Sequence, residues 1–283
     1  DGNINGGEGN DSVYVDGTIR SANIIGGSGN DVISLHGSII GSSINGGNND
    51  NDCIYADGTI SGGATLEGAN HISLKGSVSG SSIYGSSIYA DATINSSEIK
   101  GGSSKDIISI KGEIIDSSVY SGADNDNIYA DGKISGSSID SGSGDDIISL
   151  KGEIIDSSVC GGAGTDTLIL DSTVNNRVYV QNVESIRGGS GQDSIYVIGS
   201  INGGTVDGGA GSDIIIMQDV ENTTVFGGAG DDSIFVAGSL KGSLGGGEGN
   251  DSIYVAKMNN AVIDAGKGDD AIIVASWKNG GSI

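Results

Sequence analysis

The chain has 283 residues, including 53 glycines and no proline, and its 37 acidic and 13 basic residues give a net charge of -24. A charge this negative, without clusters of lysine and arginine, argues against nucleic-acid binding and favours the binding of cations. No apolar run approaches the ~18 residues that a membrane-spanning helix needs, so we expect no membrane insertion.

A glycine-rich turn that ends in aspartate recurs along the chain. Aligning the turns on their last residue gives one column whose members are usually 19 to 21 residues apart, with extremes of 16 and 27. The column is Asp11, Asp31, Asp52, Asn70, Ser86, Asp106, Asp126, Asp146, Asp166, Asp193, Asp213, Asp232, Asp251 and Asp270. These fourteen units leave no room for a second domain, so we expect one continuous repeat domain over 1–283.

Each turn is followed by apolar residues at every second position, as in Val13 and Val15. This period predicts a strand with one buried face. A second turn of the form G-x-I, as at 17–19, and a stretch such as GSSI at 41–44 then lead to the next glycine-rich turn. One unit cannot bury its own apolar face, but units stacked at ~4.8 Å share a core. We therefore predict an all-β fold, a parallel β-solenoid of about fourteen coils of about 20 residues.

Two outward columns alternate from coil to coil in the first part of the chain. One alternates between acid and base, and its neighbour alternates between tyrosine and serine. The first reads Asp16, His36, Asp57, Lys75, Asp91, Lys111, Asp131 and Lys151, and the second reads Tyr14, Ser34, Tyr55, Ser73, Tyr89, Ser109, Tyr129 and Ser149. Stacked at ~4.8 Å, opposite charges attract and fix the register. We distinguish this laddered part, 1–160, from 161–283, where the turns follow a more regular pattern.

An apolar stripe replaces the charged ladder between residues 196 and 275. Its two columns read Tyr196, Ile216, Phe235, Tyr254 and Ile273, and Ile198, Gln218, Ala237, Ala256 and Ala275. Such a surface is typical of a contact site. We expect lateral self-association here, cover by a partner or cover by further chain. End-to-end association is also expected, because no capping unit is visible in the sequence and open strand edges recruit further strands.

The glycine-rich turns have the composition of a calcium site. Glycine lets carbonyl oxygens converge, and the aspartate adds a charged oxygen. Hard oxygen ligands, with only two histidines and two cysteines in the chain, favour Ca²⁺ over transition metals. One turn supplies only part of a shell of six to eight oxygens, so the turn of the next coil must complete it.

Seven copies of this turn, among them "GGEGNDSVY", "GGSGNDVIS", "GGAGDDSIF" and "GGEGNDSIY", resemble the calcium-binding nonapeptide of the RTX (repeats-in-toxin) family. The resemblance implies a calcium-loaded parallel β-roll in an exported bacterial or phage protein, with aspartate side chains and turn carbonyls as ligands. Family rolls carry calcium turns on both edges, whereas this chain has one calcium turn per coil, so we expect a single row of ions. The motif is lost at 67–70 and 84–86, and Lys105 adds a cation within 101–106, so the sequence gives little support for metal there.

Counting adjacent aspartate-bearing coils predicts about ten Ca²⁺ ions in one row. The expected ligands are Asp11, Asp31, Asp52, Asp126, Asp146, Asp166, Asp193, Asp213, Asp232, Asp251 and Asp270.

The predicted function is that of an exported, calcium-binding structural protein outside the cell or on its surface, such as an adhesin segment, surface-layer component or fibre. Two alternatives stay open: the secretion or folding module of an RTX toxin or exoenzyme, and an ice-binding solenoid, which the lack of threonine at the outward turn position disfavours. We do not expect an enzyme, since no turn continues into a phosphate-binding GK[ST] motif and His36 and His71 fall in different columns.

Overall fold

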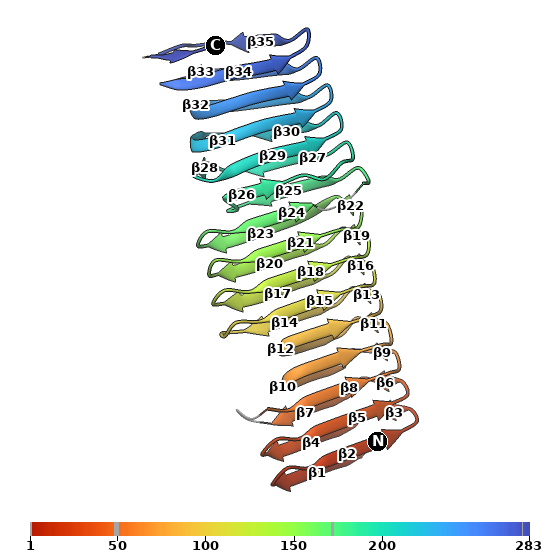
Figure 1. The fold of residues 1–283 in the computed structure, drawn as a ribbon. Helices are drawn as coiled ribbons and strands as arrows, with labels where there is room; N and C mark the ends of the chain where they lie inside the picture. Colours follow the sequence, from red (N-terminus) through yellow and green to blue (C-terminus); the bar gives the residue numbers. More distant parts are fainter. Residues whose placement is uncertain (1, 48–50, 171–172, 279) are drawn as a thin grey trace. The chain divides into compact units, whose positions relative to one another are not determined.

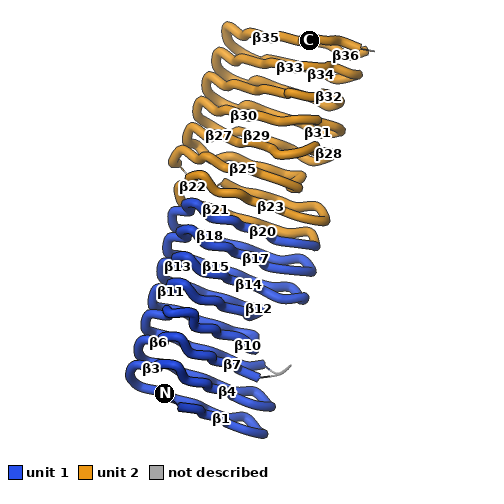
Figure 2. Tube along the Cα trace, turned by 180° about the vertical axis from the view of Figure 1, so that it is seen from behind, with its two compact units in different colours: residues 1–143 blue, residues 144–283 orange. Residues whose placement is uncertain are grey.

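The computed structural model describes residues 2–47, 51–170, 173–278 and 280–283. Every regular element in these ranges is a β-strand, and the strands pair in parallel within stacks of coils (Figure 1). Within the same ranges, no helix is long and apolar enough to cross a membrane. The structure comprises two compact units, residues 1–143 and 144–283 (Figure 2). The predicted parallel β-solenoid is confirmed.

Each coil of unit 1 contributes to three parallel stacks. The strands that follow the glycine-rich turns form the first stack: β2 (Ser12–Asp16), β5 (Val32–His36), β8 (Cys53–Ala56), β10 (Thr65–Leu74), β12 (Ser82–Ala90), β15 (Ile107–Ile110) and β18 (Asn127–Ala130). The strands that precede these turns form the second: β1 (Asn3–Glu8), β4 (Asn23–Ser28), β7 (Ser43–Gly47), the first halves of β10 and β12, β14 (Glu98–Gly102), β17 (Ser118–Ala123) and β20 (Ser138–Ser143). Two-residue strands form the third, at the opposite edge: β3 (Ile19–Arg20), β6 (Ile39–Ile40), β9 (Ile60–Ser61), β11 (Val78–Ser79), β13 (Ile94–Asn95), β16 (Ile114–Ile115) and β19 (Ile134–Ser135).

Columns of aliphatic side chains fill the interior between the first two stacks. Ile33, Ile54 and Ile72 lie in register on successive coils, and each is completely buried. Each such side chain contributes about 1.5–3 kcal/mol by leaving water. The inward position of the predicted period-two pattern therefore forms the core.

The alternating outward columns lie in the predicted register in unit 1. Tyr14 pairs with Ser34, and Ser34 pairs with Tyr55. In the charged column, Asp57 contacts His36 on one side at 2.8 Å and Lys75 on the other at 3.3 Å. Further along, Lys111 lies 2.7 Å from Asp91. Exposed pairs of this kind add little stability, and their main effect is to specify which coil lies next to which.

A ladder of buried serines lies at the edge opposite the glycine-rich turns of unit 1. The Ser117 hydroxyl donates to the Ile115 carbonyl at 2.6 Å and accepts from the Ser97 amide of the preceding coil at 3.1 Å. Ser81 and Ser97 repeat both contacts. These hydroxyls are satisfied by protein atoms alone, so this edge needs no ion.

Ser117→Ala should destabilise the folded chain by about 1–3 kcal/mol, because the Ser97 amide loses its acceptor in a buried position. Thermal unfolding in calcium measures the loss. Ser118→Ala, at the exposed neighbouring position, is the matched control and should change stability by less than about 0.5 kcal/mol. Equal stability of the two variants would contradict a structural role for the serine ladder.

Unit 2 has two main stacks, and its coils change register once. The first stack contains β21 (Ile147–Leu150), β24 (Thr167–Leu170), β26 (Ser185–Arg187), β29 (Thr205–Ala210), β31 (Val220–Ala229), the second half of β32 (Ser233–Glu248), β34 (Ala261–Lys267) and β36 (Gly281–Ser282). The second contains β23 (Ser157–Ala163), β25 (Arg177–Gln181), β27 (Ser194–Ile198), β30 (Ile214–Met217), the first half of β32, β33 (Ser252–Met258) and β35 (Ala271–Val274). The short strands β22 (Ile154–Ile155) and β28 (Ile201–Asn202) lie at opposite edges.

The register change exchanges the roles of the two stacks. β24 follows a glycine-rich turn, yet β29, two coils further in the same stack, precedes one. In the other stack, β23 precedes a glycine-rich turn and β27 follows one. The chain therefore makes one and a half coils between Asp166 and Asp193, and the glycine-rich turns move to the opposite edge of unit 2.

Candidate metal site

The turn aspartates form a hydrogen-bonded ladder. The Asp11 amide donates to Oδ1 of Asp31, and the Asp31 amide donates to Oδ1 of Asp52, both at 2.7 Å. In unit 2 the same contact joins Asp213 to Asp232 at 2.8 Å. In these contacts one carboxylate oxygen of an aspartate accepts from the amide of the preceding coil and so holds the two coils in register.

In seven aspartates of this column, a carboxylate oxygen is buried and has no hydrogen-bond partner. These are Asp11, Asp31, Asp106, Asp166, Asp213, Asp232 and Asp251. Among the described residues, no lysine, arginine or histidine forms an ion pair with these seven side chains. Except for Asp11, each has at most 2% of its surface exposed. A buried carboxylate without a counter-charge is strongly unfavourable, so each of these side chains needs either a proton or a bound cation.

Where a turn begins with glycine, the missing side chain leaves room between that oxygen and a carbonyl of the next coil; the turns of Asp126, Asp146 and Asp270 begin instead with Ser121, Ser141 and Ala265. A Cβ added to Gly26 would lie 2.6 Å from Oδ2 of Asp31 and also within 3 Å of the Gly46 carbonyl oxygen. At Gly227 the corresponding distances are 2.5 Å to Oδ2 of Asp232 and 2.6 Å to the Gly246 oxygen. The arrangement therefore brings together a charged oxygen from one coil and a main-chain oxygen from the next.

The remaining donors would have to come from the main chain. No group of three or more His, Cys, Asp or Glu side chains that could hold a metal occurs within the described ranges. Calcium accepts backbone carbonyls together with carboxylates, whereas soft or borderline metals prefer sulfur and imidazole. The donor set fits calcium, with one carboxylate per coil and carbonyls from two coils.

Burial raises the pKa of several of these carboxyl groups. The pKa is about 6 for Asp106, Asp166 and Asp232, and about 7 for Asp213, where the neighbouring carboxylates of Asp193 and Asp232 add to the effect of burial. Folded-state values above the ordinary ~3.9 mean that the metal-free fold binds more protons than the unfolded chain between about pH 4 and 7. These groups stabilise the metal-free fold below about pH 4, and that contribution is lost as the pH rises through 6 to 7.

Because calcium needs the ionised carboxylate, we expect its affinity to fall as the pH is lowered through the same window. With a pKa of about 7 at Asp213, this carboxyl group is mostly ionised at pH 7.5 and mostly protonated at pH 5.5, so binding of calcium to the folded chain at this site should weaken by about an order of magnitude. Isothermal titration at the two pH values tests this. Equal affinities would show that these carboxylates do not bind the ion.

Two of the eleven predicted ligands lack this unpartnered oxygen. In Asp193, Oδ2 accepts from the Gly189 amide at 3.1 Å, and Oδ1 accepts from the main-chain and side-chain nitrogens of Asn176 at 3.0 and 2.9 Å. Asp270, on the last aspartate-bearing coil, is half-buried and accepts from the Asp251 amide at 2.9 Å. Asp52, Asp126 and Asp146 are also buried, with 1% of their surface exposed.

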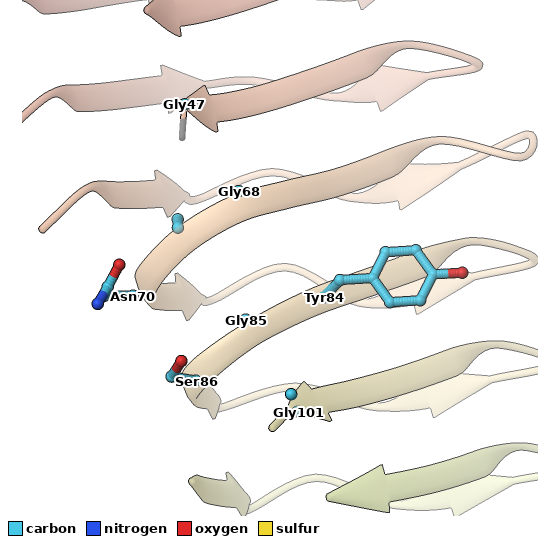
Figure 3. Close-up of a pocket in the computed structure, with 9 residues that line it drawn as sticks. Gly47, Gly68, Asn70, Tyr84, Gly85, Ser86 and Gly101 are labelled. Carbon is cyan, nitrogen blue, oxygen red and sulfur yellow. The ribbon is translucent and has the colours of Figure 1, made fainter. Parts of the chain in front are cut away.

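Asp106, which is not among the eleven predicted ligands, also has a buried oxygen without a hydrogen-bond partner. The row of aspartates is interrupted in the two coils before it. Oδ1 of Asp106 is the unpartnered atom, while Oδ2 accepts from the Gly102 amide. In the two preceding coils, Asn70 and Ser86 take the aspartate position, and β10 and β12 run through this edge without a glycine-rich turn. A hollow of about 530 Å³ opens there (Figure 3). In the sequence, Asp106 could have been identified as a candidate ligand by its place in the column of turn residues spaced about 20 apart.

The predicted single row of ions is wrong for unit 2. Asp146 and Asp166 lie at one edge, where the Asp166 amide donates to Glu184 and the Glu184 carbonyl accepts from Thr205. Asp193 lies at the opposite edge, above Asn176, which in turn accepts from the Ile154 amide at 3.1 Å. The count of about ten ions treated Asp166 and Asp193 as neighbours. They do not form a site together, because the chain makes one and a half coils between them. Unit 2 has two rows of turns, one on each edge.

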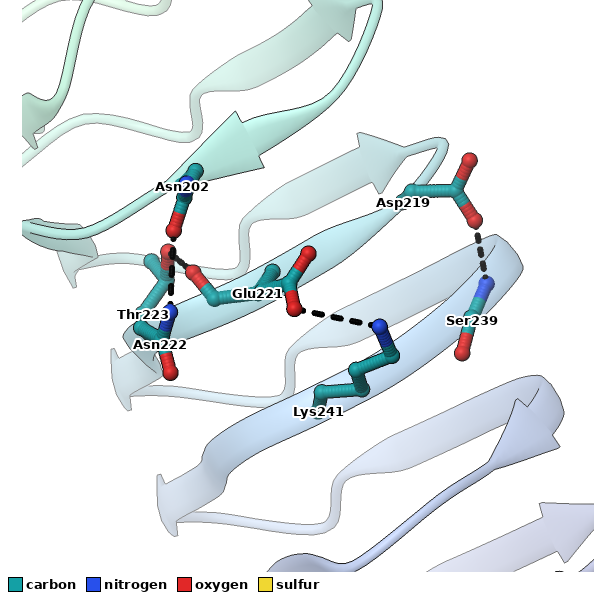
Figure 4. A network of polar contacts seen from close by, with 7 residues as sticks. All are labelled: Asn202, Asp219, Glu221, Asn222, Thr223, Ser239 and Lys241. Atoms are coloured by element: carbon teal, nitrogen blue, oxygen red, sulfur yellow. Dashed lines mark hydrogen bonds and ion pairs between the residues drawn. The ribbon is translucent and has the colours of Figure 1, made fainter.

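After the glycine-rich turns of unit 2 have moved to the opposite edge, the edge without them is held together by ordinary polar contacts (Figure 4). Thr223 donates to the Gly203 carbonyl at 3.0 Å, Lys241 pairs with Glu221 at 3.0 Å, and Asp219 accepts from the Ser239 amide at 2.7 Å. Like the serine ladder, this edge satisfies its own polar atoms. The contrast restricts the candidate cation sites to the aspartate-bearing turns.

Comparisons with known proteins give one structural relative to report. No family model matches the chain, and no curated protein matches it. Among solved structures it is similar to a hyperactive, Ca²⁺-dependent, β-helical antifreeze protein from an Antarctic bacterium. The match has 23% sequence identity and a TM-score of 0.41, and it covers 90% of this chain and 76% of the other.

Proposed function

We propose that this chain is an exported, calcium-binding structural protein, a solenoid of the RTX type that calcium holds in its folded form. The observation that carries the proposal is the column of buried aspartate oxygens without hydrogen-bond partners, which at turns such as those of Asp31 and Asp232 lie beside a carbonyl of the next coil. A net charge of -24 supports it, because each bound Ca²⁺ removes two negative charges from a crowded edge.

Export follows from the ion that the fold needs. Cytosol keeps free calcium low, whereas the external medium holds millimolar amounts, so the chain would stay unfolded until it leaves the cell. Folding should therefore have a calcium midpoint between about 10⁻⁴ and 10⁻³ M, the range of extracellular calcium modules. Far-UV circular dichroism during a calcium titration measures the midpoint. A midpoint below about 10⁻⁷ M would remove the argument for export.

A structural role also accounts for the apolar stripe of unit 2. Tyr179, Tyr196, Ile216, Phe235, Tyr254 and Ile273 form one outward column in register. The rings of Phe235 and Tyr254 stack at 4.7 Å, and Ile273 is 59% exposed. We propose that copies associate laterally through this column. Sedimentation velocity in calcium, with Phe235→Ser as the disrupted variant, decides between association and a monomer.

A further inference from the structure

The coil after Asp166 lacks the glycine-rich turn. Between β25 and β26 the chain reads Asn182, Val183 and Glu184, which matches no calcium motif. By sequence, the row at this edge of unit 2 should have nothing to complete a site above Asp166.

A carbonyl nevertheless occupies the place that the next glycine-rich turn would fill. A Cβ added to Gly161 would lie 2.6 Å from Oδ2 of Asp166 and also within 3 Å of the Asn182 carbonyl oxygen. In a regular coil, the same position at Gly26 faces Asp31 and the Gly46 carbonyl. Asn182 achieves this with a left-handed backbone, φ +49°, which asparagine adopts more readily than most residues.

A carboxylate also occupies the place of the next aspartate. The Asp166 amide donates to Oε2 of Glu184 at 2.8 Å, as the Asp31 amide donates to Oδ1 of Asp52. Glu184 therefore replaces the ladder aspartate with a longer side chain. Asp166 itself is 1% exposed, and its Oδ2 has no hydrogen-bond partner.

From this geometry we propose an additional divalent-cation site, formed by the carboxylates of Asp166 and Glu184 and the main-chain carbonyl of Asn182. The site ends the row at this edge without a glycine-rich turn above it. Its oxygen donors select a hard cation such as Ca²⁺. The inference rests on the proposed calcium binding of the regular turns and adds one site that the repeat motif does not mark.

Native mass spectrometry of the full chain, with calcium at the concentration that just saturates the wild type, counts the ions bound. Glu184→Gln keeps an oxygen that can accept from the Asp166 amide but removes the charge, so it should bind one ion fewer. Asp166→Asn should also bind one ion fewer, and the double variant should lose only that same ion. Glu113→Gln, at an exposed position of unit 1, is the control and should bind the wild-type number.

The outcomes separate this inference from the proposed function. If the wild type binds no calcium, the proposed function fails and this site fails with it. If the wild type binds calcium but Glu184→Gln binds the same number of ions, the additional site alone is refuted. Circular dichroism in calcium verifies that each variant is folded. Should Glu184→Gln not fold, an unchanged count in Asp166→Asn refutes the site independently.

Discussion

Removing calcium at pH 8 should abolish the fold. At that pH the carboxyl groups with a pKa of about 6 to 7, those of Asp106, Asp166, Asp213 and Asp232, are mostly ionised, and without a counter-ion they lie buried at the edges of their units. Each site stabilises the folded chain by about 2.7 kcal/mol when calcium is a hundredfold above its dissociation constant. Several such sites together exceed the 5–15 kcal/mol by which an ordinary domain is stable. Calcium therefore decides whether this chain folds.

The measurement is thermal unfolding, followed by circular dichroism, in millimolar calcium and in excess EGTA. We expect a cooperative transition in calcium, no transition in EGTA, and full recovery when calcium is restored. Magnesium at the same concentration is the control, since its small octahedral shell suits carbonyl-lined turns poorly. A chain with the same melting temperature in EGTA and in calcium would refute the assignment of these turns to calcium.

Gly26→Ala should strongly destabilise the regular turn that ends in Asp31 and should block its calcium site. The φ of Gly26 is not positive, so the backbone itself tolerates alanine. The added methyl group would instead fall between Oδ2 of Asp31 and the Gly46 carbonyl, where we place the ion. Overpacking costs about 1–3 kcal/mol, and loss of the ion costs about 2.7 kcal/mol more at a hundredfold excess of calcium.

Gly2→Ala is the matched control, since a Cβ there meets no atom within 4 Å. Calcium stoichiometry and melting temperature should both fall in Gly26→Ala and stay unchanged in the control. A variant that loses stability but keeps the wild-type number of ions would place the ion elsewhere in the turn.

Much of the architecture could be read from sequence because the repeat is local. The period-two apolar residues identify the strands, and the acid–base alternation identifies which coils are neighbours, as at His36, Asp57 and Lys75. Both signals depend only on spacing. The aspartate column itself was visible for the same reason.

Other features depend on how one coil lies above the next, and sequence alone does not give that offset. The Oδ1 ladder follows from the amide of one coil lying under the carboxylate of the next, and in aspartates such as Asp31 it leaves the other oxygen without a hydrogen-bond partner. The transfer of turns in unit 2 did leave a trace, since Asp166 and Asp193 are 27 residues apart where 20 is usual. A longer spacing alone could equally mean a looped insertion, and only the strand pairing distinguishes the two.

Calcium-anomalous diffraction from crystals of the full chain tests the central claim most directly. We predict a peak within about 2.3–2.6 Å of the unpartnered oxygen in the seven aspartates that have been named for it, on one edge in unit 1 and on both edges in unit 2. Carboxylates that bind only water or a neighbouring amide, in crystals grown in millimolar calcium, would contradict the account.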